Sequence, residues 1–322
     1  MAEAIDESPD VSVLIINYKT VDLVCKAISS VISRTDGVKV EIIVVDNDSS
    51  DNVCEVVGDF FQNVSCIQSG SNLGFGKANN LASLQAKGKY YFLMNPDSFL
   101  ENNALKILFD ALEADPEIGA AGGNLFGDNS APGYSFCRDL PGYFTEIDDL
   151  FFGFLSKLRY RGNVYHNFGS TPIFIKGAIS GAGMFIRADY FDDMKGFDPD
   201  FFMYYEDTEF FHRLHKKSCR VASFPAVRMV HSEGGSEPKK EKTIERSLRS
   251  KWIYLQKCKG RVSLPVFYFL TCLIAWQRII VFTIFRKEAK KKYWEKKLKM
   301  ARKTYKDHTL LFSSEGVKRR VK

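Results

Sequence analysis

The chain has 322 residues, of which 45% are apolar and 14% are aromatic. A chain of this size and composition buries a substantial core, which excludes an intrinsically disordered protein. The net charge of +6 is unevenly spread: residues 286–322 carry 15 Lys and Arg against 4 Asp and Glu, and the remainder carries 30 against 35. A basic tail on a neutral-to-acidic body indicates an anionic partner, either phospholipid head groups or nucleic acid.

The cysteines and the first residues favour a reducing compartment. The sequence has no CxxC pair, so neither a disulfide framework nor a zinc site is predicted. The start, MAEAIDESPD, lacks the basic and apolar stretches of a secretion signal. We therefore expect the protein to stay in the cytoplasm. The seven scattered cysteines are Cys25, Cys54, Cys66, Cys137, Cys219, Cys258 and Cys272.

Apolar runs alternate with helical patterns over residues 11–125. Unbroken runs at 11–17, 41–45 and 90–94 are typical of strands in a parallel sheet that is covered on both faces. Strands that alternate with helices predict a doubly wound, mostly parallel α/β sheet. Residues 127–174 are aromatic and irregular, and the chain becomes helical and basic after Ser236. The expected helices of the first half cover roughly residues 21–34, 52–61, 77–87 and 103–114.

Polar residues follow each of the three predicted strands. Asn17 and Tyr18 end the first run, Asp46 follows the second, and Asn95-Pro96-Asp97 follows the third. In open α/β sheets, ligands bind beyond the carboxyl ends of the strands, so these side chains are candidates for a binding site. Each segment is also a common turn sequence, so either interpretation stays open at this point.

Two further segments are candidates for chemistry. Residues 72–80, NLGFGKANN, have Asn79 where a dinucleotide fingerprint requires its third glycine, which disfavours a Rossmann dehydrogenase. Residues 201–213 place Glu206, Asp207 and Glu209 within one turn among aromatic side chains. Such crowded carboxylates are hard to explain by packing alone, and a solvated acidic turn is the alternative. His231 follows a short apolar run, and a lone histidine is more often structural than a ligand.

Taken together, these segments resemble glycosyltransferase family 2. The motifs are VSVLIINYK, IIVVDNDSSD, SNLGFGKANN, FLMNPD, GAGMFIRADYF and GFDPDFFMYYEDTEFFHRL, with His231 downstream, and the match covers about residues 11–235. The NPD form and the segment RDLP at residues 138–141 are similar to the bacterial rhamnosyltransferase branch. The resemblance implies the nucleotide-sugar fold called GT-A and transfer of a sugar with inversion at its anomeric carbon.

The resemblance also assigns roles to residues. Asp207 is the implied catalytic base, and Glu206 orients the base or the acceptor. Asp97 matches the last acidic residue of the DxD motif, with Asn95 at its first position, and His231 completes a site for Mg²⁺ or Mn²⁺. The implied donor-binding residues are Asn17, Tyr18, Asp46, Asn72, Gly74, Lys77, Asn95 and Asp97, and the implied acceptor-binding residues are Arg138, Gly181, Ala182 and Glu206.

Residues 264–285 are long and apolar enough to cross a bilayer, but Gln277 and Arg278 interrupt them. An arginine at the centre of a membrane helix costs about 2.5–3.5 kcal/mol. Basic residues flank both ends of the stretch, and a basic amphipathic pattern follows it. These features favour in-plane or re-entrant association with an anionic membrane over a simple crossing. A soluble helical hairpin is the alternative.

The expected organisation has four parts. Residues 1–10 form a disordered N-terminus, 11–125 a nucleotide-sugar-binding half, 126–235 an acceptor half, and 236–322 a membrane-associating extension. The implied activity is transfer of L-rhamnose from dTDP-rhamnose to a saccharide or polyprenyl-diphosphate-linked saccharide, at the inner face of the cell membrane. Alternatives are another donor, such as galactofuranose, glucose or galactose, and a non-catalytic carbohydrate-binding scaffold. A nucleic-acid partner is not expected, since no base-reading module is recognisable.

Overall fold

The computed structural model describes residues 8–232 and 241–320, with residues 311–320 described by their backbone alone. The chain forms two compact units. The first, here called the sheet unit, comprises Met1–Leu140, Asn163–Pro199 and Phe210–Gly235. The second, the helical unit, comprises Pro141–Gly162, Asp200–Glu209 and Ser236–Lys322. Two segments from the middle of the sequence therefore belong with the C-terminal helices.

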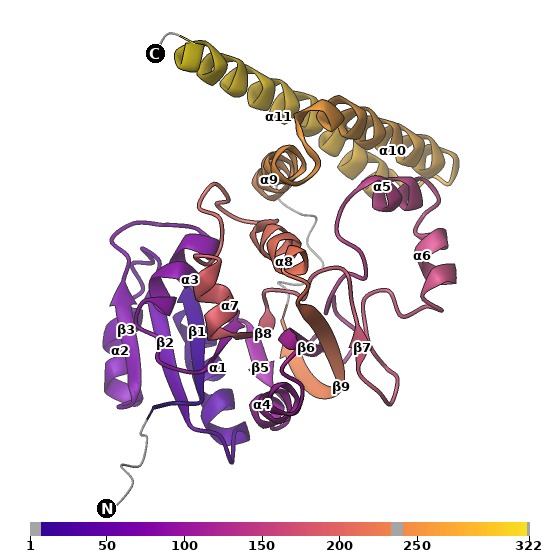
Figure 1. The fold of residues 1–322 in the computed structure, drawn as a ribbon. Helices are drawn as coiled ribbons and strands as arrows, with labels where there is room; N and C mark the ends of the chain where they lie inside the picture. Colours follow the sequence, from indigo (N-terminus) through magenta and orange to yellow (C-terminus); the bar gives the residue numbers. More distant parts are fainter. Residues whose placement is uncertain (1–7, 233–240, 321–322) are drawn as a thin grey trace, which may run out of the picture. The chain divides into compact units, whose positions relative to one another are not determined.

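The sheet unit contains one sheet of nine strands among the described residues, in the order β3-β2-β1-β4-β8-β6-β9-β5, with β7 paired to β9. Figure 1 shows the strands with their flanking helices. The strands are β1 (Val11–Asn17), β2 (Val40–Asp46), β3 (Val64–Gln68), β4 (Tyr90–Met94), β5 (Ser98–Leu100), β6 (Ile118–Phe126), β7 (Ile173–Phe174), β8 (Gly183–Arg187) and β9 (Arg220–His231). The helices are α1 (Val21–Arg34), α2 (Val53–Phe60), α3 (Phe75–Ser83), α4 (Ala104–Ala114), α7 (Ala188–Asp193) and, from Phe210 onward, α8 (Glu206–Lys216).

Strand β1 is buried along its whole length. Val11, Val13 and Ile15 pack in one core cluster with residues of α1, α2 and α4. Leu14 and Ile16 pack in a second cluster with residues of α3, α7 and α8. Since successive side chains of a strand point to opposite faces, helices cover both faces of the sheet. This double burial explains why the sequence shows an unbroken apolar run here.

The sheet has a parallel half and a mixed half. Strands β1 to β4 are parallel to one another where they pair. Strand β8 is antiparallel to β4 and to β6, and β9 is parallel to β6 but antiparallel to β5 and β7. The predicted α/β architecture is confirmed, and the three predicted strands and four predicted helices are present. Antiparallel pairing in the second half makes the sheet mixed.

The carboxyl ends of β2, β1 and β4 form a row at one edge of the sheet. Asn17 is in register with Asp46 of β2, and Ile15 is in register with Met94 of β4. Neighbouring strands lie about 4.8 Å apart, so Asp46 and the segment after Met94 are separated by roughly 10 Å across β1. The polar residues that follow the three predicted strands therefore share one edge, as the sequence indicated.

The interpretation of the cysteines was wrong for one pair. Cys54 and Cys66 form a disulfide between α2 and β3, with their Cα atoms 5.3 Å apart. The two residues are separated by 12 positions and meet because β3 returns beside β2 after α2. Such a pair carries no short-spacing signature that a search for CxxC motifs detects. The other five cysteines, all within the described residues, form no disulfide.

The helical unit packs around the buried indole of Trp252. Its indole N–H donates a hydrogen bond to the hydroxyl of Thr304 at 2.9 Å. Phe267 and Ala301 belong to the same core cluster. The predicted helical character beyond residue 240 is confirmed. The elements are α5 (Tyr143–Leu150), α6 (Phe154–Arg159), the first turn of α8, α9 (Glu241–Lys259), a 3-10 turn η1 (Arg261–Ser263), α10 (Leu264–Ile284) and α11 (Glu288–Arg320).

The predicted division into four parts stays a prediction. Residues 1–7 of the predicted disordered N-terminus lie outside the described residues. Within the described part, segments 141–162 and 200–209 cluster with the helices that follow residue 240 rather than with the sheet.

Candidate functional site

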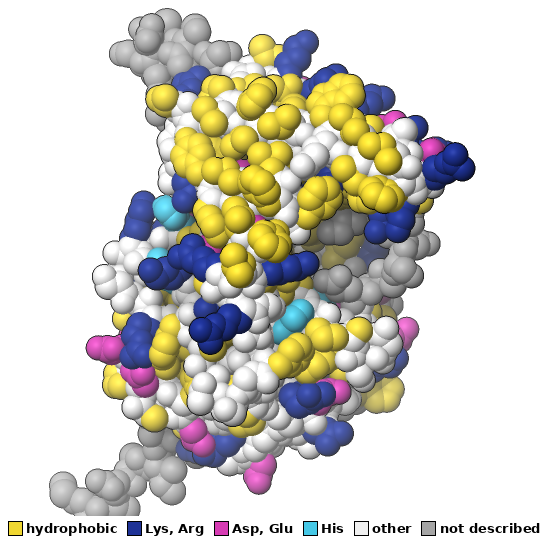
Figure 2. All heavy atoms as spheres, turned by 90° about the vertical axis from the view of Figure 1, so that its right-hand side faces the viewer, with side chains coloured by type: hydrophobic (Ala, Val, Ile, Leu, Met, Phe, Trp, Pro, Cys, Tyr) yellow, Lys and Arg dark blue, Asp and Glu magenta, His cyan; other side chains and the backbone are white. Residues whose placement is uncertain are grey.

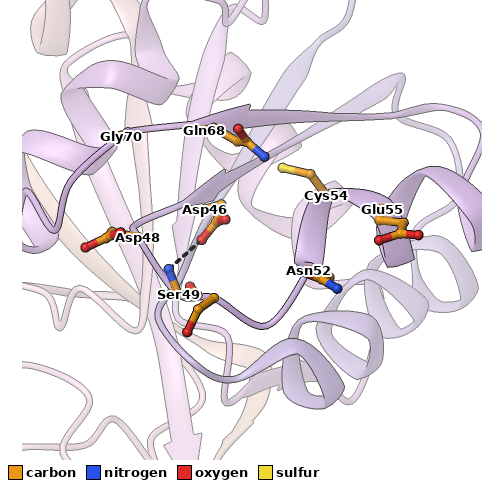
Figure 3. A pocket seen from close by; sticks show the side chains of 9 residues that line it. Asp46, Asp48, Ser49, Asn52, Cys54, Glu55, Gln68 and Gly70 are labelled. Carbon is orange, nitrogen blue, oxygen red and sulfur yellow. Dashed lines mark hydrogen bonds between the residues drawn. The ribbon is translucent and has the colours of Figure 1, made fainter.

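A cavity of about 340 Å³ lies beyond the carboxyl end of β2. Asp46, the last residue of this strand, accepts a hydrogen bond through Oδ1 from the backbone N–H of Ser49 at 2.9 Å (Figure 3). The following loop adopts left-handed backbone at Asp48, Ser50 and Asn52. Asn and Asp are the side chains that tolerate this conformation best. The residues lining the cavity are Asp46, Asp48, Ser49, Ser50, Asn52, Cys54, Glu55, Gln68 and Gly70.

Asn17 holds this loop in place from the end of β1. Its side chain is fully buried. The amide Nδ2 donates to the Ser49 hydroxyl at 2.8 Å and to Asp51 Oδ1 at 2.9 Å. Its Oδ1 accepts from the backbone N–H of Thr20 at 3.1 Å. The side chain of Asn17 is thus engaged within the protein, whereas the next residue, Tyr18, is 46% exposed.

Replacing Asn17 with Ala is expected to lower the free energy of unfolding by about 1–3 kcal/mol, because buried partners lose their hydrogen bonds. The measurement is denaturant unfolding of both proteins. Gln62→Ala, at an exposed position, is the matched control and should change stability little. Equal stability of the Asn17→Ala variant and the wild type would show that the amide does not hold the loop.

The predicted glycine segment lies beside the same loop. Asn47 Oδ1 accepts from the backbone N–H of Leu73 at 2.8 Å. Asn72 Oδ1 accepts from the N–H of Gly74 at 3.0 Å, and Gly74 has a φ of +79° directly before α3. This conformation favours glycine. Lys77 is exposed in the first turn of α3. The N-terminus of the helix therefore carries a cationic side chain, and both features favour the binding of an anion.

Asp97 and His231 are brought together by strand pairing. Strand β5 runs antiparallel to the end of β9, with Ser98 opposite His231. The distance from His231 Nε2 to Asp97 Oδ1 is 3.3 Å. Asn95 Nδ2 lies 3.3 Å from the same imidazole nitrogen. The three residues that the resemblance connected across 136 positions of sequence form one polar cluster at the edge of the sheet.

The chemistry of this cluster fits a divalent cation that also binds a diphosphate. One carboxylate oxygen and one imidazole nitrogen suit Mn²⁺ or Mg²⁺, whose remaining positions phosphate oxygens and water occupy. The side chains of His231 and Asp97 are 14% and 27% exposed, so a ligand can reach them. Over residues 8–232 and 241–320, no group of three or more His, Cys, Asp and Glu side chains stands together. Within these described residues, the cluster supplies one carboxylate, from Asp97, and one imidazole, from His231.

Glu206 and Asp207 begin α8, in the part of that helix that belongs to the helical unit. Glu206 is buried, and its Oε2 has no hydrogen-bond partner. Burial, reinforced by the charge of Asp207, raises the pKa of Glu206 to about 8. Asp207 Oδ1 accepts from the backbone N–H of Thr208 at 2.6 Å. Two adjacent carboxyl groups with different environments allow one to be neutral and the other ionised.

The backbone before this pair is strained. Tyr204 and Tyr205 both have positive φ, at 72° and 66°. Non-glycine residues in this conformation cost roughly 1–3 kcal/mol each, and such strain is often found at functional sites. The ring of Tyr205 packs 5.5 Å from that of Tyr254 in the same unit. This strained backbone lies directly before the two carboxyl groups at the start of α8.

The raised pKa of Glu206 predicts how stability depends on pH. The unfolded carboxyl ionises near 4.5 and the folded one near 8, so folding favours the proton-bound form. Its contribution is fully present below pH 4.5 and is lost as pH rises through about 8. We expect the wild type to lose stability relative to Glu206→Gln across this window, measured by thermal unfolding at several pH values. Parallel pH profiles of the two proteins would contradict a neutral, buried Glu206.

Arg213 anchors a loop of the sheet unit. Its guanidinium donates to the carbonyl oxygen of Met194 at 2.7 Å and to that of Gly196 at 2.8 Å. It also lies 5.4 Å from the centre of the Phe210 ring. These contacts connect α8 to the loop of residues 194–196.

The three predicted acceptor residues other than Glu206 lie in the sheet unit. The backbone carbonyl of Arg138 accepts from the N–H of Lys176 at 3.2 Å. A side chain added at Gly181 would meet the ring of Phe75 at 3.2 Å, so glycine permits a close approach beside the start of α3. Ala182 is 2% exposed and belongs to the core. Their roles toward an acceptor stay predictions.

Several residues of the cavity escaped the sequence interpretation. Glu55 and Gln68 line it, and Asp51 ties its loop to Asn17. The repeated Asp and Ser of residues 46–51 were the available signal, but the same composition is common in turns. Gln68 lies on β3, a strand that was not predicted from the sequence.

The profile described as glycosyl transferase family 2 matches residues 12–179. N-acetylglucosaminyl-diphospho-decaprenol L-rhamnosyltransferase of Mycobacterium tuberculosis is 25% identical over 212 residues, 61% of this chain and 68% of that protein. The low-salt glycan biosynthesis hexosyltransferase Agl10 of Haloferax volcanii is 25% identical over 234 residues, 70% of this chain and 67% of that protein.

Among solved structures, a mannosyltransferase from Pyrobaculum calidifontis in complex with GDP-Man and Mn²⁺ is similar, with a TM-score of 0.59. The sequence identity is 14%, and the match covers 94% of this chain and 88% of that one. The predicted GT-A fold is confirmed.

Proposed function

Because this chain belongs to glycosyltransferase family 2, we propose that it transfers L-rhamnose from dTDP-rhamnose to a saccharide acceptor, with inversion at the anomeric carbon. The observation that carries the proposal is the row of polar groups at the carboxyl edge of β2, β1 and β4. The Asp46 cavity lies at one end of this row, and the Asp97–His231 pair follows β4 at the other. A nucleotide extends over such a distance between its base and its diphosphate.

The two ends of the row suit different parts of the donor. The polar Asp46 cavity accepts hydrogen bonds from the base or the ribose. The start of α3, with Gly74 and Lys77, presents backbone N–H groups and a cation to phosphate oxygens. Asn95, Asp97 and His231 then lie where a diphosphate would share a divalent cation with the protein.

The reaction exchanges one carbon–oxygen bond for another. The acceptor oxygen forms a bond to the anomeric carbon while the bond from that carbon to the diphosphate breaks, and the acceptor proton passes to Asp207. A bound Mg²⁺ or Mn²⁺ would neutralise the negative charge that grows on the leaving diphosphate. Glu206 is neutral below its raised pKa, and its Oε2 has no partner among the described residues, so it would donate a hydrogen bond that orients the acceptor or Asp207.

The acceptor we propose is a saccharide linked to polyprenyl diphosphate. The mycobacterial relative is named for such a lipid-linked substrate, and the archaeal relative is named for glycan biosynthesis. An acceptor of this kind resides in a membrane, which agrees with the basic and apolar composition of residues 251–310. We therefore propose a cytoplasmic protein that associates peripherally with the inner face of the cell membrane.

A panel of nucleotide sugars tests the choice of donor. The purified protein is mixed with dTDP-rhamnose, UDP-galactofuranose, UDP-glucose and UDP-galactose in turn, with Mg²⁺, Mn²⁺ or a chelator, and nucleotide release is measured. We expect turnover of dTDP-rhamnose to exceed that of the others by about tenfold or more, and to cease with chelator. Preferred turnover of a UDP-sugar would overturn the proposed donor. Absence of turnover with every donor, in folded protein with lipid-linked acceptors, would favour a carbohydrate-binding scaffold.

A further inference from the structure

Helix α10 is apolar on both of its faces, but only one face is buried. The inward face repeats with helical spacing through Leu264, Phe267, Thr271, Ile274, Ala275 and Arg278. The outward face repeats through Val266, Phe269, Leu273, Trp276, Ile280 and Ile284, which are 40–70% exposed. A helix that is apolar all round normally lies in a core or in a membrane. No part of the helical unit that the structure describes buries the outward face of α10.

Gln277 and Arg278 of α10 form hydrogen bonds on its inward side. Gln277 donates to the backbone carbonyl of Leu150 at 2.8 Å. Arg278 donates to the carbonyl of Asp149, and its guanidinium lies 3.4 Å from the centre of the Phe152 ring. A helix that crossed a bilayer as a single span would give up these contacts. They fix α10 along the segment that contains α5.

Helices α5 and α6 extend the exposed apolar surface of α10. The ring of Tyr143 stacks on that of Phe267 with centroids 4.5 Å apart, which joins α5 to α10. Figure 2, which looks at the side where α10, α5 and α6 lie in Figure 1, shows hydrophobic side chains gathered over these helices. The exposed apolar residues of α5, α6 and the turn between them are 42–70% exposed: Tyr143, Ile147, Phe151, Phe152, Phe154 and Leu158. We call the exposed residues of α10, α5 and α6 the apolar face.

The flanks of α10 in the apolar face are cationic. Between Glu245 and Glu288 the sequence has no Asp or Glu, and it carries nine Lys and Arg. Arg261 precedes α10, and Arg286 and Lys287 follow it, all exposed. Contiguous apolar surface marks a site for another surface, and the cations at both ends of α10 select an anionic one.

We propose that the apolar face seats the protein on the surface of an anionic phospholipid bilayer, with α10 in the plane of the membrane rather than across it. The aromatic and aliphatic side chains enter the boundary between head groups and acyl chains, and the flanking cations contact the phosphates. A second copy of the chain would bring like charges together, which disfavours self-association through this face. The inference rests on the peripheral association proposed above but needs neither donor nor acceptor for its test.

The first test is flotation of the whole protein with vesicles of phosphatidylcholine alone or mixed with phosphatidylglycerol. Binding is expected to the mixed vesicles and to weaken at high salt. Phe269→Glu with Ile280→Glu should weaken it by more than about tenfold, and so should Phe154→Glu with Leu158→Glu. Phe60→Glu with Leu84→Glu, at positions 75% and 81% exposed in the sheet unit, is the matched control and should bind as the wild type does.

Three results of this test would overturn the proposal. They are absence of vesicle binding, equal binding by the α10 variant and the wild type, and a concentration-dependent dimer that the α10 variant loses. Circular dichroism of each variant establishes that it is folded. Donor turnover is measured separately, so failure of vesicle binding is distinguishable from failure of the proposed transferase activity.

The second test measures depth through Trp276, which lies in the middle part of α10 and is 48% exposed. Lipids brominated near the head group or near the bilayer centre quench its fluorescence, and Trp276→Phe supplies the background from the other tryptophans. An in-plane helix predicts stronger quenching by the shallow bromines. Stronger quenching by the deep bromines would indicate a spanning helix and would contradict the proposed orientation. By length and composition the stretch Arg261–Ile284 is long and apolar enough for such a span.

Discussion

Replacing Asp207 with Asn is expected to lower kcat by about 10²–10⁴-fold while the KM for the donor changes little. The factor is the contribution that a positioned general base makes to catalysis. An amide cannot take the acceptor proton, but its oxygen can still accept the hydrogen bond from Thr208 that Asp207 Oδ1 accepts in the wild type. The start of α8 should therefore keep its structure. The measurement is steady-state transfer at varied donor and acceptor concentrations.

The matched control for this variant is Asp200→Asn. Asp200 belongs to the same unit and forms an exposed ion pair with Lys257, with 64% of its side chain exposed. Exposed pairs of this kind contribute little to stability, so the control should be active and folded. If the Asp207→Asn variant retained most of the wild-type kcat, Asp207 would not be the catalytic base.

Replacing Asp97 with Ala is expected to reduce turnover at saturating donor by about 10²-fold or more and to abolish its dependence on Mn²⁺. His231→Ala should act in the same direction, because the two side chains approach to 3.3 Å and would hold the same cation. The readouts are initial rate against Mn²⁺ concentration and Mn²⁺ binding in the presence of nucleotide diphosphate. Full activity of Asp97→Ala in a chelator would contradict a shared metal site.

Replacing Asn95 with Asp is expected to strengthen the binding of Mn²⁺. The substitution supplies the carboxylate that the family motif has at this position, next to His231 Nε2 at 3.3 Å. With one more anionic ligand, half-maximal activity should require about tenfold less Mn²⁺. A higher Mn²⁺ requirement in this variant would show that the amide of Asn95 serves another purpose, such as orienting the imidazole.

The first half of the fold could be predicted from the local sequence pattern because its strands and helices bury apolar side chains. Strand β1 and helix α1 begin and end at the predicted residues, since both are bounded by polar residues and bury a continuous apolar run or stripe. Strand β3 was missed because it lies at the edge of the sheet, where its five residues are only partly buried or exposed. Strand β9 contains Pro225 and charged residues, which break the pattern.

The site was predictable in its residues but not in its geometry. The segment IIVVDNDSSD indicated Asp46, and the structure places it in the wall of a cavity. The pairing of Asp97 with His231 depends on β5 meeting β9, a contact between distant segments that no local pattern specifies. The same limit applies to residues 141–162, an aromatic and irregular part of the sequence that belongs with the C-terminal helices. Long-range packing, rather than propensity, decides such contacts.

The measurement that tests the central claim most directly is the anomeric configuration of the product, determined by NMR after transfer from dTDP-rhamnose to a lipid-linked saccharide. A base at Asp207 that activates the acceptor for a single displacement predicts a product whose configuration is opposite to that of the donor, in an amount that grows with time in the wild type and not in Asp207→Asn. A product that retains the configuration of the donor would contradict this mechanism.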